Sequence, residues 1–410
     1  MPLPAASGTG PQQIGSKMSA QALPKSHGRR DQRARRAPLG RLTAALTVVA
    51  GLLVWSSAQS SAQASGEFHP DGHGCSSSAD AGRGAQPPGR RGDLAYVANY
   101  GSNTVSVVDT DTNTVATTVP VDKGPVYVAV APHRTCAFVT NFDAGSVSVI
   151  DTETNTVVKT LTADDNIGQQ PYGMAVTPDG AQVYIANQAS DSVSVIDTRT
   201  NTVVKVLTQS DGIGDAPSLV AVTPDGSHAY ITNQESNDVT VINTRDNTLA
   251  TVITDGIGDF PYDVAFTPDG SRAYVTDAAG KQDGSVAVID IATNTVVSKI
   301  THSDGLGELP LGLAVTPDGS RLYVANRNSD SVSVIDTHDD SVIGTIEDGI
   351  GDEPIAVAIT RKAHRAYVTS QVSGSVSVID THDDSVIGTI EDGIGNSPFG
   401  IAIRSRNGHS

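Results

Sequence analysis

Seven copies of one sequence unit follow each other from residue 94 to the end of the chain, at spacings of 42 to 49 residues. The clearest part of the unit is an aromatic residue, two small or β-branched residues and usually Asn, as in Tyr96-Val97-Ala98-Asn99. The aromatic position is held in the later copies by Phe138, Tyr184, Tyr230, Tyr274, Tyr323 and Tyr367. A period in the forties with four strand-like runs is typical of a β-propeller blade. The repeat therefore predicts an all-β fold.

One copy shows the four strands. Residues 172–177, 183–187, 193–197 and 202–207 are expected to form strands A, B, C and D, because they are rich in Val, Ile and Thr. Pro178-Asp179-Gly180 supplies the turn between A and B, and residues 197–201 supply the turn between C and D. Strands B and C are apolar on both faces, which indicates that each blade is packed between two others.

The order of strands predicts how the ring closes. The first copy starts at strand B with Leu94, and the chain ends with a lone strand A over residues 398–403. Each strand type occurs seven times. We therefore expect a seven-bladed β-propeller of four-stranded antiparallel blades over residues 93–404, followed by a tail over 405–410. One blade is composite, with three N-terminal strands and one C-terminal strand, which leaves no open end.

Runs of the types Tyr-Val-Thr-Asn, Val-Ser-Val-Ile-Asp-Thr, Thr-Asn-Thr-Val-Val and Val-Thr-Pro-Asp-Gly recur in this order over residues 94–403. In this the chain resembles the YVTN-type β-propeller repeat family, with a YncE-like seven-bladed propeller. The resemblance implies a secreted or surface-layer protein of bacteria or archaea. It also implies a relation to lactonase-like and nitrite-reductase-like propellers.

The N-terminal region predicts export. Six Arg residues between 29 and 41 precede an apolar run over 42–55, and Ala62-Gln63-Ala64 forms a small-x-small cleavage pattern. Residues 1–64 are therefore interpreted as a secretory signal peptide, and the apolar run is short for a membrane span. Residues 65–92 are expected to be a flexible linker. Sec and twin-arginine export both stay open, as does the choice between Met1 and Met18 as the start.

Charge limits the partners. Residues 1–64 carry a net charge of +7, so the −18 of the whole chain leaves −25 on the rest. Such a charge repels phosphate backbones. We therefore expect no nucleic-acid partner, no membrane span in the mature form and a monomer that binds an unknown protein or small molecule, preferably a cationic one. Export makes a disulfide between Cys75 and Cys136 chemically possible, with two free thiols as the alternative.

Loop lengths point to one face. The A–B and C–D turns have constant length, whereas the B–C loop is longer between Asp277 and Val286 and the D–A loops vary. Antiparallel strands place the B–C and D–A loops on the same face, which predicts the binding face. Neutral drift in loop length is the alternative.

Two sets of residues on that face are candidates for a site. The residue after a repeated Pro opens strand A at the channel mouth and is aromatic at Tyr172, Tyr262 and Phe399, with Tyr127 one place further on in its copy. We expect a ligand to lie against these four rings. Packing between blades is the other explanation for these rings. Acidic Asp-Gly-Ile-Gly loops suggest Ca²⁺ on Asp215, Asp259 and Asp352, with solubilising charge as the alternative.

No residue emerges as catalytic. The motifs G-x-S-x-G, H-E-x-x-H and the Walker loop are absent, and the single Trp, Trp55, lies in the signal peptide. The sequence therefore favours a secreted or cell-surface binding scaffold. A lactonase-like or metal-dependent lyase-type enzyme that uses the same channel mouth is the alternative, since one fold serves many functions.

Overall fold

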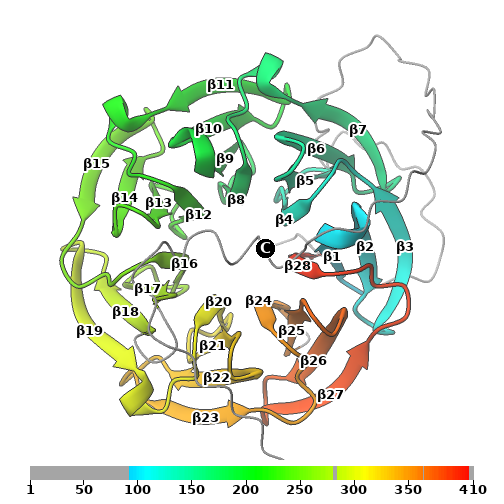
Figure 1. Cartoon of the computed structure of the whole chain (residues 1–410), viewed down its shortest axis with the longest axis vertical. Coiled ribbons are helices and arrows are strands. Elements are labelled where there is room, and N and C mark those ends of the chain that lie inside the picture. Colours follow the sequence, from blue (N-terminus) through cyan, green and yellow to red (C-terminus); the bar gives the residue numbers. More distant parts are fainter. Residues whose placement is uncertain (1–91, 280–283, 363, 406–410) are drawn as a thin grey trace, which may run out of the picture. The chain divides into compact units, whose positions relative to one another are not determined.

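The computed structural model describes residues 92–279, 284–362 and 364–405. The chain divides into two units, Met1–Phe68 and His69–Ser410, and all described residues belong to the second. The predicted signal peptide, most of the linker and Cys75 lie outside the described residues. The second unit contains seven four-stranded antiparallel sheets arranged as a ring (Figure 1). The predicted seven-bladed β-propeller is therefore confirmed.

The strands of each blade are lettered A to D from the axis outward. Strand A is β28 (Pro398–Arg404), β4 (Pro125–Val130), β8 (Pro171–Val176), β12 (Pro217–Val222), β16 (Pro261–Phe266), β20 (Pro310–Val315) and β24 (Pro354–Ile359) in blades 1 to 7. Strand B is β1 (Leu94–Asn99), β5 (Cys136–Asn141), β9 (Gln182–Asn187), β13 (His228–Asn233), β17 (Arg272–Asp277), β21 (Arg321–Asn326) and β25 (Arg365–Ser370).

The outer half of each blade follows the same order. Strand C is β2 (Thr104–Asp109), β6 (Ser146–Asp151), β10 (Ser192–Asp197), β14 (Asp238–Asn243), β18 (Ser285–Asp290), β22 (Ser331–Asp336) and β26 (Ser375–Asp380). Strand D is β3 (Thr114–Pro120), β7 (Thr156–Leu161), β11 (Thr202–Leu207), β15 (Thr248–Ile253), β19 (Thr295–Thr301), β23 (Val342–Ile346) and β27 (Ser385–Ile390).

Five single-turn 3₁₀ helices lie in the described loops: η2 (Tyr100–Ser102), η3 (Ala163–Asp165), η4 (Gln188–Ser190), η5 (Gln209–Asp211) and η6 (His302–Asp304). None of the helices in the described part of the chain is long and apolar enough to span a membrane.

Local sequence explains the turns of each blade. In blade 3 the Asp197 carboxylate accepts hydrogen bonds from the backbone N–H groups of Arg199 and Thr200, at 2.7 and 3.2 Å. Asn201 then adopts a left-handed conformation with φ of 50°, which Asn tolerates better than most residues. The predicted strand D of this blade matches β11, and strands A to C begin one residue earlier than predicted.

The aromatic residue of the repeat joins neighbouring blades. Its ring is fully buried in all seven copies. In six copies the Tyr hydroxyl also donates a hydrogen bond to an Asn or Asp in the C–D turn of the next blade, as from Tyr96 to Asn155 at 3.0 Å and from Tyr367 to Asn113 at 2.8 Å. In the remaining copy, blade 2, this residue is Phe138, which has no hydroxyl. The repeated Tyr therefore secures each blade to the next.

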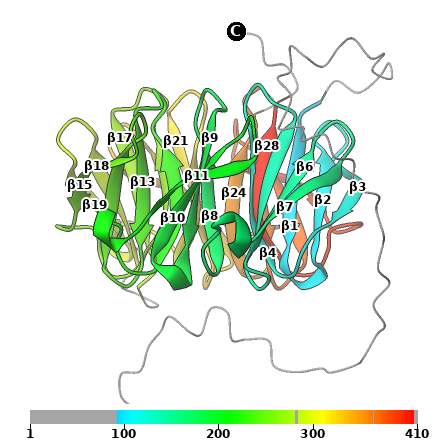
Figure 2. The same ribbon diagram turned by 90° about the horizontal axis from the view of Figure 1, so that it is seen from above.

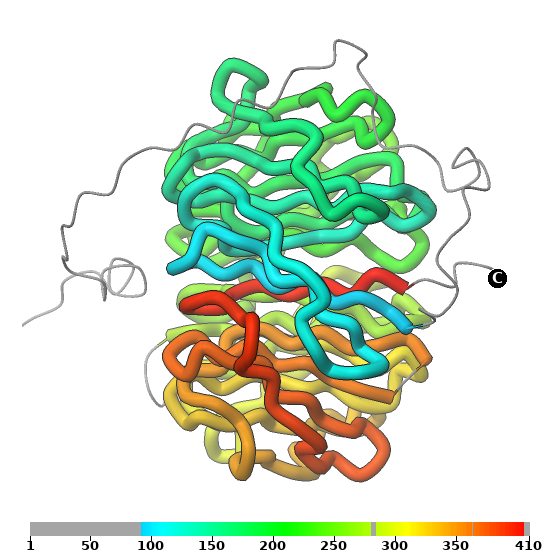
Figure 3. Tube along the Cα trace, turned by 90° about the vertical axis from the view of Figure 1, so that its right-hand side faces the viewer, coloured from blue at the N-terminus to red at the C-terminus, as the bar shows by residue number. Residues whose placement is uncertain are grey.

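The ring closes as predicted. Strand β1 pairs with β2 on one side and with the C-terminal β28 on the other, with Tyr96 opposite Ala402. In Figure 3 the red end of the chain runs beside its blue beginning. Blade 1 is thus composite, with three strands from the start of the described chain and one from its end.

Candidate functional site

Every blade has the same orientation, so the loops fall into two sets. The B–C and D–A loops lie at one end of the strands and form what we call the loop face. The A–B and C–D turns lie at the other end and form the turn face. Figure 2 shows the ring edge-on, with the strands running between the two faces.

A repeated backbone contact shapes the entry of each innermost strand on the loop face. The residue before the first Pro of strand A has a positive φ in all seven blades, although only Gly124 is glycine; the others are Gln170, Ala216, Phe260, Leu309, Glu353 and Ser397. Its carbonyl accepts a hydrogen bond from the N–H that follows strand B, as between Phe260 and Ala278 at 3.0 Å. This contact fixes the start of strand A near the axis.

The four aromatic residues predicted to bind a ligand meet at the axis. The ring centroids of Tyr127 and Tyr172 are 5.4 Å apart, and that of Phe399 lies 5.7 Å from Tyr127 and 6.0 Å from Tyr172. The hydroxyl of Tyr262 lies 2.8 Å from that of Tyr172 and 3.3 Å from that of Tyr127. We call Tyr127, Tyr172, Tyr262 and Phe399 the axial aromatic cluster.

The axial aromatic cluster is tightly packed. None of its four side chains is more than 9% exposed, and the edge-to-face contacts between its rings are favourable for aromatic pairs. Burial raises the pKa of all three phenols well above their ordinary value. The tyrosines are therefore neutral hydrogen-bonding groups at physiological pH. Packing of the four rings is observed, and their contact with a ligand stays a prediction.

Asp263 lies beside the cluster and was missed by sequence reasoning. It is the only acidic residue on the seven innermost strands. Its carboxylate accepts hydrogen bonds from the backbone N–H groups of Val264 at 2.7 Å and of Leu313 in blade 6 at 3.2 Å. Burial raises the pKa of Asp263 to about 7, although these two amides oppose the shift. The signal was present in the sequence, because aligning the seven Pro-initiated strands shows one Asp in an apolar set.

An ion pair lies at the rim of the loop face. Arg327 donates hydrogen bonds to one carboxylate oxygen of Glu353, with Nε at 3.0 Å, and its side chain is 15% exposed. The positive charge of Arg327 acts to lower the pKa of Tyr172, against the larger effect of burial. This electrostatic effect connects the rim with the axial aromatic cluster.

Blade 5, which carries Asp263, also differs from the other blades at the last residue of strand B. In five other blades a buried Asn at this position donates from Nδ2 to two side chains of strand C, as from Asn187 to Ser192 and Ser194. Blade 5 has Asp277, which instead accepts hydrogen bonds from the Ala279 N–H at 3.0 Å and the Ser285 hydroxyl at 3.2 Å. Burial raises the pKa of Asp277 to about 6.

The two faces differ in charge. The described loops of the loop face contain 19 Asp and Glu side chains and two cationic ones, Lys123 and Arg327. The described turns of the turn face contain 11 acidic and five basic side chains. The net charge is therefore −17 on the loop face and −6 on the turn face, His being counted as neutral.

The residues predicted to bind Ca²⁺ are not gathered into one site. Asp215, Asp259 and Asp352 lie exposed in the D–A loops that precede β12, β16 and β24. Within the described ranges, no group of three or more His, Cys, Asp or Glu side chains is placed to hold a metal ion. Their role in metal binding stays a prediction.

Cys136 was predicted as one partner of a possible disulfide with Cys75. It begins β5, is 2% exposed and is not a free thiol. Since Cys75 lies outside the described residues, the pairing of the two cysteines stays a prediction.

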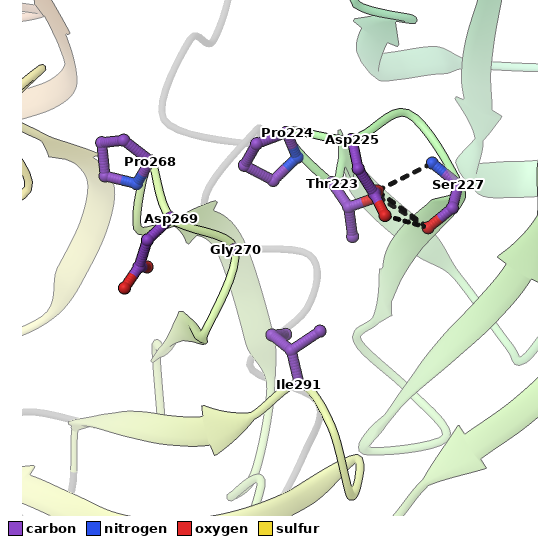
Figure 4. A pocket seen from close by; sticks show the side chains of 8 residues that line it. All are labelled: Thr223, Pro224, Asp225, Ser227, Pro268, Asp269, Gly270 and Ile291. Carbon is purple, nitrogen blue, oxygen red and sulfur yellow. Dashed lines mark hydrogen bonds between the residues drawn. The ribbon is translucent and has the colours of Figure 1, made fainter.

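The turn face contains a hollow of about 320 Å³ between blades 4 and 5 (Figure 4). It is lined by Thr223, Pro224, Asp225, Ser227, Pro268, Asp269, Gly270 and Ile291. The Asp225 carboxylate accepts a hydrogen bond from the Thr223 hydroxyl at 2.6 Å and from the N–H and hydroxyl of Ser227, and these bonds lower its pKa. Asp269 makes the same contacts in the next blade. Both carboxylates therefore serve to stabilise their own turns.

Comparisons with known proteins agree with the fold. Residues 91–407 match the family model described as a YNCE-like β-propeller. None of the curated proteins compared with the sequence matches it.

Several solved structures resemble the chain. Hydrazine synthase of Kuenenia stuttgartiensis is 23% identical with a TM-score of 0.62, over 71% of this chain and 93% of that one. A functionally unknown protein of Desulfotomaculum acetoxidans DSM 771 is 18% identical with a TM-score of 0.65, over 77% and 100%. A putative 6-phosphogluconolactonase of Bacteroides fragilis NCTC 9343 is 17% identical with a TM-score of 0.60, over 78% and 99%. At such identities the likeness shows the fold alone.

Proposed function

Because this chain belongs to the YNCE-like β-propeller family, and a shared fold does not set one activity, we propose that it is a secreted or cell-surface binding scaffold. Its partner is cationic and lies on the loop face, over the channel mouth. The partner is a protein or a small molecule rather than a nucleic acid, because the face is strongly negative.

The difference in charge between the faces carries this proposal. Solubility alone would be served by carboxylates spread over both faces, whereas 19 of them face two cations in the described loops of the loop face. This is also the face whose loops vary in length, and insertions confined to one face of a repeat protein favour a binding role. The rigid blades beneath hold the loops in place.

Binding of an octalysine peptide tests the proposal. A triple variant, Asp215→Asn, Asp259→Asn and Asp352→Asn, removes three exposed carboxylates of the loop face. At roughly 0.5 kcal/mol for each exposed charge, we expect binding to weaken about tenfold in isothermal titration calorimetry. Raising NaCl from about 50 to about 200 mM should weaken wild-type binding further, because exposed charges are screened.

A matched variant on the turn face is the control. Asp111→Asn, Glu153→Gln and Asp246→Asn remove the same number of exposed carboxylates from the C–D turns. If the two triple variants lose the same amount of affinity for octalysine, only the total charge of the protein matters. The loop face would then not be the binding face.

The exported state is part of the proposal. The Arg-rich segment, the apolar run over 42–55 and Ala62-Gln63-Ala64 support cleavage after residue 64. N-terminal sequencing of protein recovered from the culture medium should give Ser65. An intact Met1 or Met18 in a membrane fraction would contradict it.

An enzyme is the second candidate, and Asp263 is the observation that favours it. A carboxyl with a pKa of about 7 is suited to act as a general base near neutral pH. The negative field favours an uncharged substrate over a phosphorylated one. Hydrolysis of glucono-δ-lactone above the spontaneous rate, lost in Asp263→Ala, would support this candidate. A rate equal to the spontaneous one would remove it for this lactone.

A further inference from the structure

The seven blades provide an internal comparison for Asp263. The third residue of strand A is Tyr127, Gly173, Leu219, Asp263, Gly312, Ala356 and Gly400 in blades 2 to 7 and 1. All seven strands keep the same pairing with strand B beyond this point. The fold therefore accepts Gly, Ala, Leu or Tyr at the third position, and none of the other six blades has a carboxylate there.

Asp263 has no cationic partner. Its two hydrogen bonds come from backbone amides, and none of the ion pairs among the described residues includes it. A carboxylate that is even partly removed from water without a counter-ion is costly. The charge of Asp263 acts on the phenols of Tyr127, Tyr172 and Tyr262. It adds to burial, the larger effect, in raising their pKa values. A cation bound here would relieve the unpaired charge.

The axis is accessible beside Asp263. The fifth residue of every innermost strand is alanine, and all seven are partly exposed: Ala129, Ala175, Ala221, Ala265, Ala314, Ala358 and Ala402. Water therefore reaches these small side chains, which lie between Asp263 and the turn-face ends of the innermost strands. Asp263 itself is partly exposed, whereas Pro261, Tyr262 and the other residues that begin the inner strands on the loop-face side are buried.

We propose that Asp263, beside the axial aromatic cluster, binds a small organic ammonium ion, which enters along the axis from the turn face. One carboxylate balances one positive charge, and the phenols of the cluster bring no positive charge that would compete for it. A divalent metal would need more oxygen ligands than this site offers. The site differs from that of the loop-face partner in being reached from the turn face, and it does not rest on the proposed function.

Tetramethylammonium chloride is the probe, with the full chain and isothermal titration calorimetry. At about pH 8 the wild type should bind it, and at about pH 5.5 binding should be at least tenfold weaker because Asp263 is then protonated. Asp263→Ala, which copies Ala356 of blade 7, should weaken binding at least tenfold at about pH 8. Equal affinity of this variant and the wild type would overturn the proposal.

Other ionisable groups near Asp263 need a control. The strands packed against β16 carry His228 and Tyr230 on β13, and Arg272, Tyr274 and Asp277 on β17. Asp277→Asn, which copies the Asn of five other blades, should bind the probe as the wild type does and keep the dependence on pH. If binding of tetramethylammonium by this variant no longer depends on pH, the titrating group is Asp277 rather than Asp263, and the proposal is overturned.

Two further binding measurements test the proposal, one with an uncharged probe and one with the loop-face variant. tert-Butanol, an uncharged molecule of similar shape, should bind at least tenfold more weakly than tetramethylammonium; equal binding would show a merely apolar cavity. The loop-face triple variant should bind tetramethylammonium unchanged even though its binding of octalysine is weakened. If Asp263→Ala fails to fold, the pH dependence of the wild type decides, because binding that does not change between about pH 5.5 and 8 excludes Asp263 as the counter-ion.

Discussion

Replacing Asp263 by Ala should make the protein relatively more stable as the pH rises. In the folded protein the pKa of Asp263 is about 7, against 3.8 ordinarily. Below about pH 4 the carboxyl is protonated in both the folded and the unfolded chain and has no effect. Between about pH 4 and 7 the unfolded chain releases the proton and the folded chain keeps it, so the free energy of unfolding falls; above about pH 7 the loss is complete.

The size of the effect follows from the shift in pKa. Each pKa unit corresponds to about 1.4 kcal/mol, so the full shift of Asp263 corresponds to about 4 kcal/mol. Partial exposure of the carboxyl reduces this penalty, and we expect roughly 2–3 kcal/mol between about pH 4.5 and 8.5. At low pH the variant should be the less stable protein, because the Leu313 N–H loses its acceptor at a cost of about 1–3 kcal/mol.

Urea unfolding followed by circular dichroism at a series of pH values gives the required free energies. The free energy of unfolding of the wild type is subtracted from that of Asp263→Ala at each pH. Contributions from other groups, such as Asp277, cancel in this difference. Asp259→Ala, an exposed carboxylate in the D–A loop before β16, is the control and should follow the wild type. A difference that stays constant with pH would refute the assignment of a raised pKa to Asp263.

Three further results are expected. Deleting residues 398–410 removes β28 and leaves β1 with an unpaired edge, so thermal unfolding should lose its cooperativity; a melt like that of the full chain would contradict this. Tyr367→Phe removes the hydroxyl bonded to Asn113 and should cost about 1 kcal/mol in urea unfolding, whereas an unchanged midpoint would show that burial of the ring suffices. In a gel-shift assay at physiological salt, duplex DNA should not bind with sub-micromolar affinity, and such binding would reveal a local basic patch.

The repeat made the fold readable from the sequence. Strand order, the number of blades and the composite blade follow from counting copies, since a blade packed between two others must be apolar on both faces of strands B and C. The position after a repeated Pro also placed Tyr172, Tyr262 and Phe399 together at the axis.

The chemistry of the axis was less predictable. Whether a ring lines an opening or fills it depends on how seven blades meet, and the four rings proved to be in contact with each other. The raised pKa of Asp263 arises from burial by neighbouring blades, which no short motif encodes. The positive φ before each Pro also runs against the local preference of that position, because a hydrogen bond from strand B stabilises it.

Closure by the last strand has a consequence for biosynthesis. The strand that completes the first blade is β28, so a ribosome must synthesise all the intervening strands before β1 can acquire its inner neighbour. Until then the growing chain exposes one strand edge at each end, and such edges are prone to pair with other molecules. The ring therefore closes only after β28 has been synthesised, and a nascent chain that stops short of Pro398 carries an open first blade however well the other six have formed.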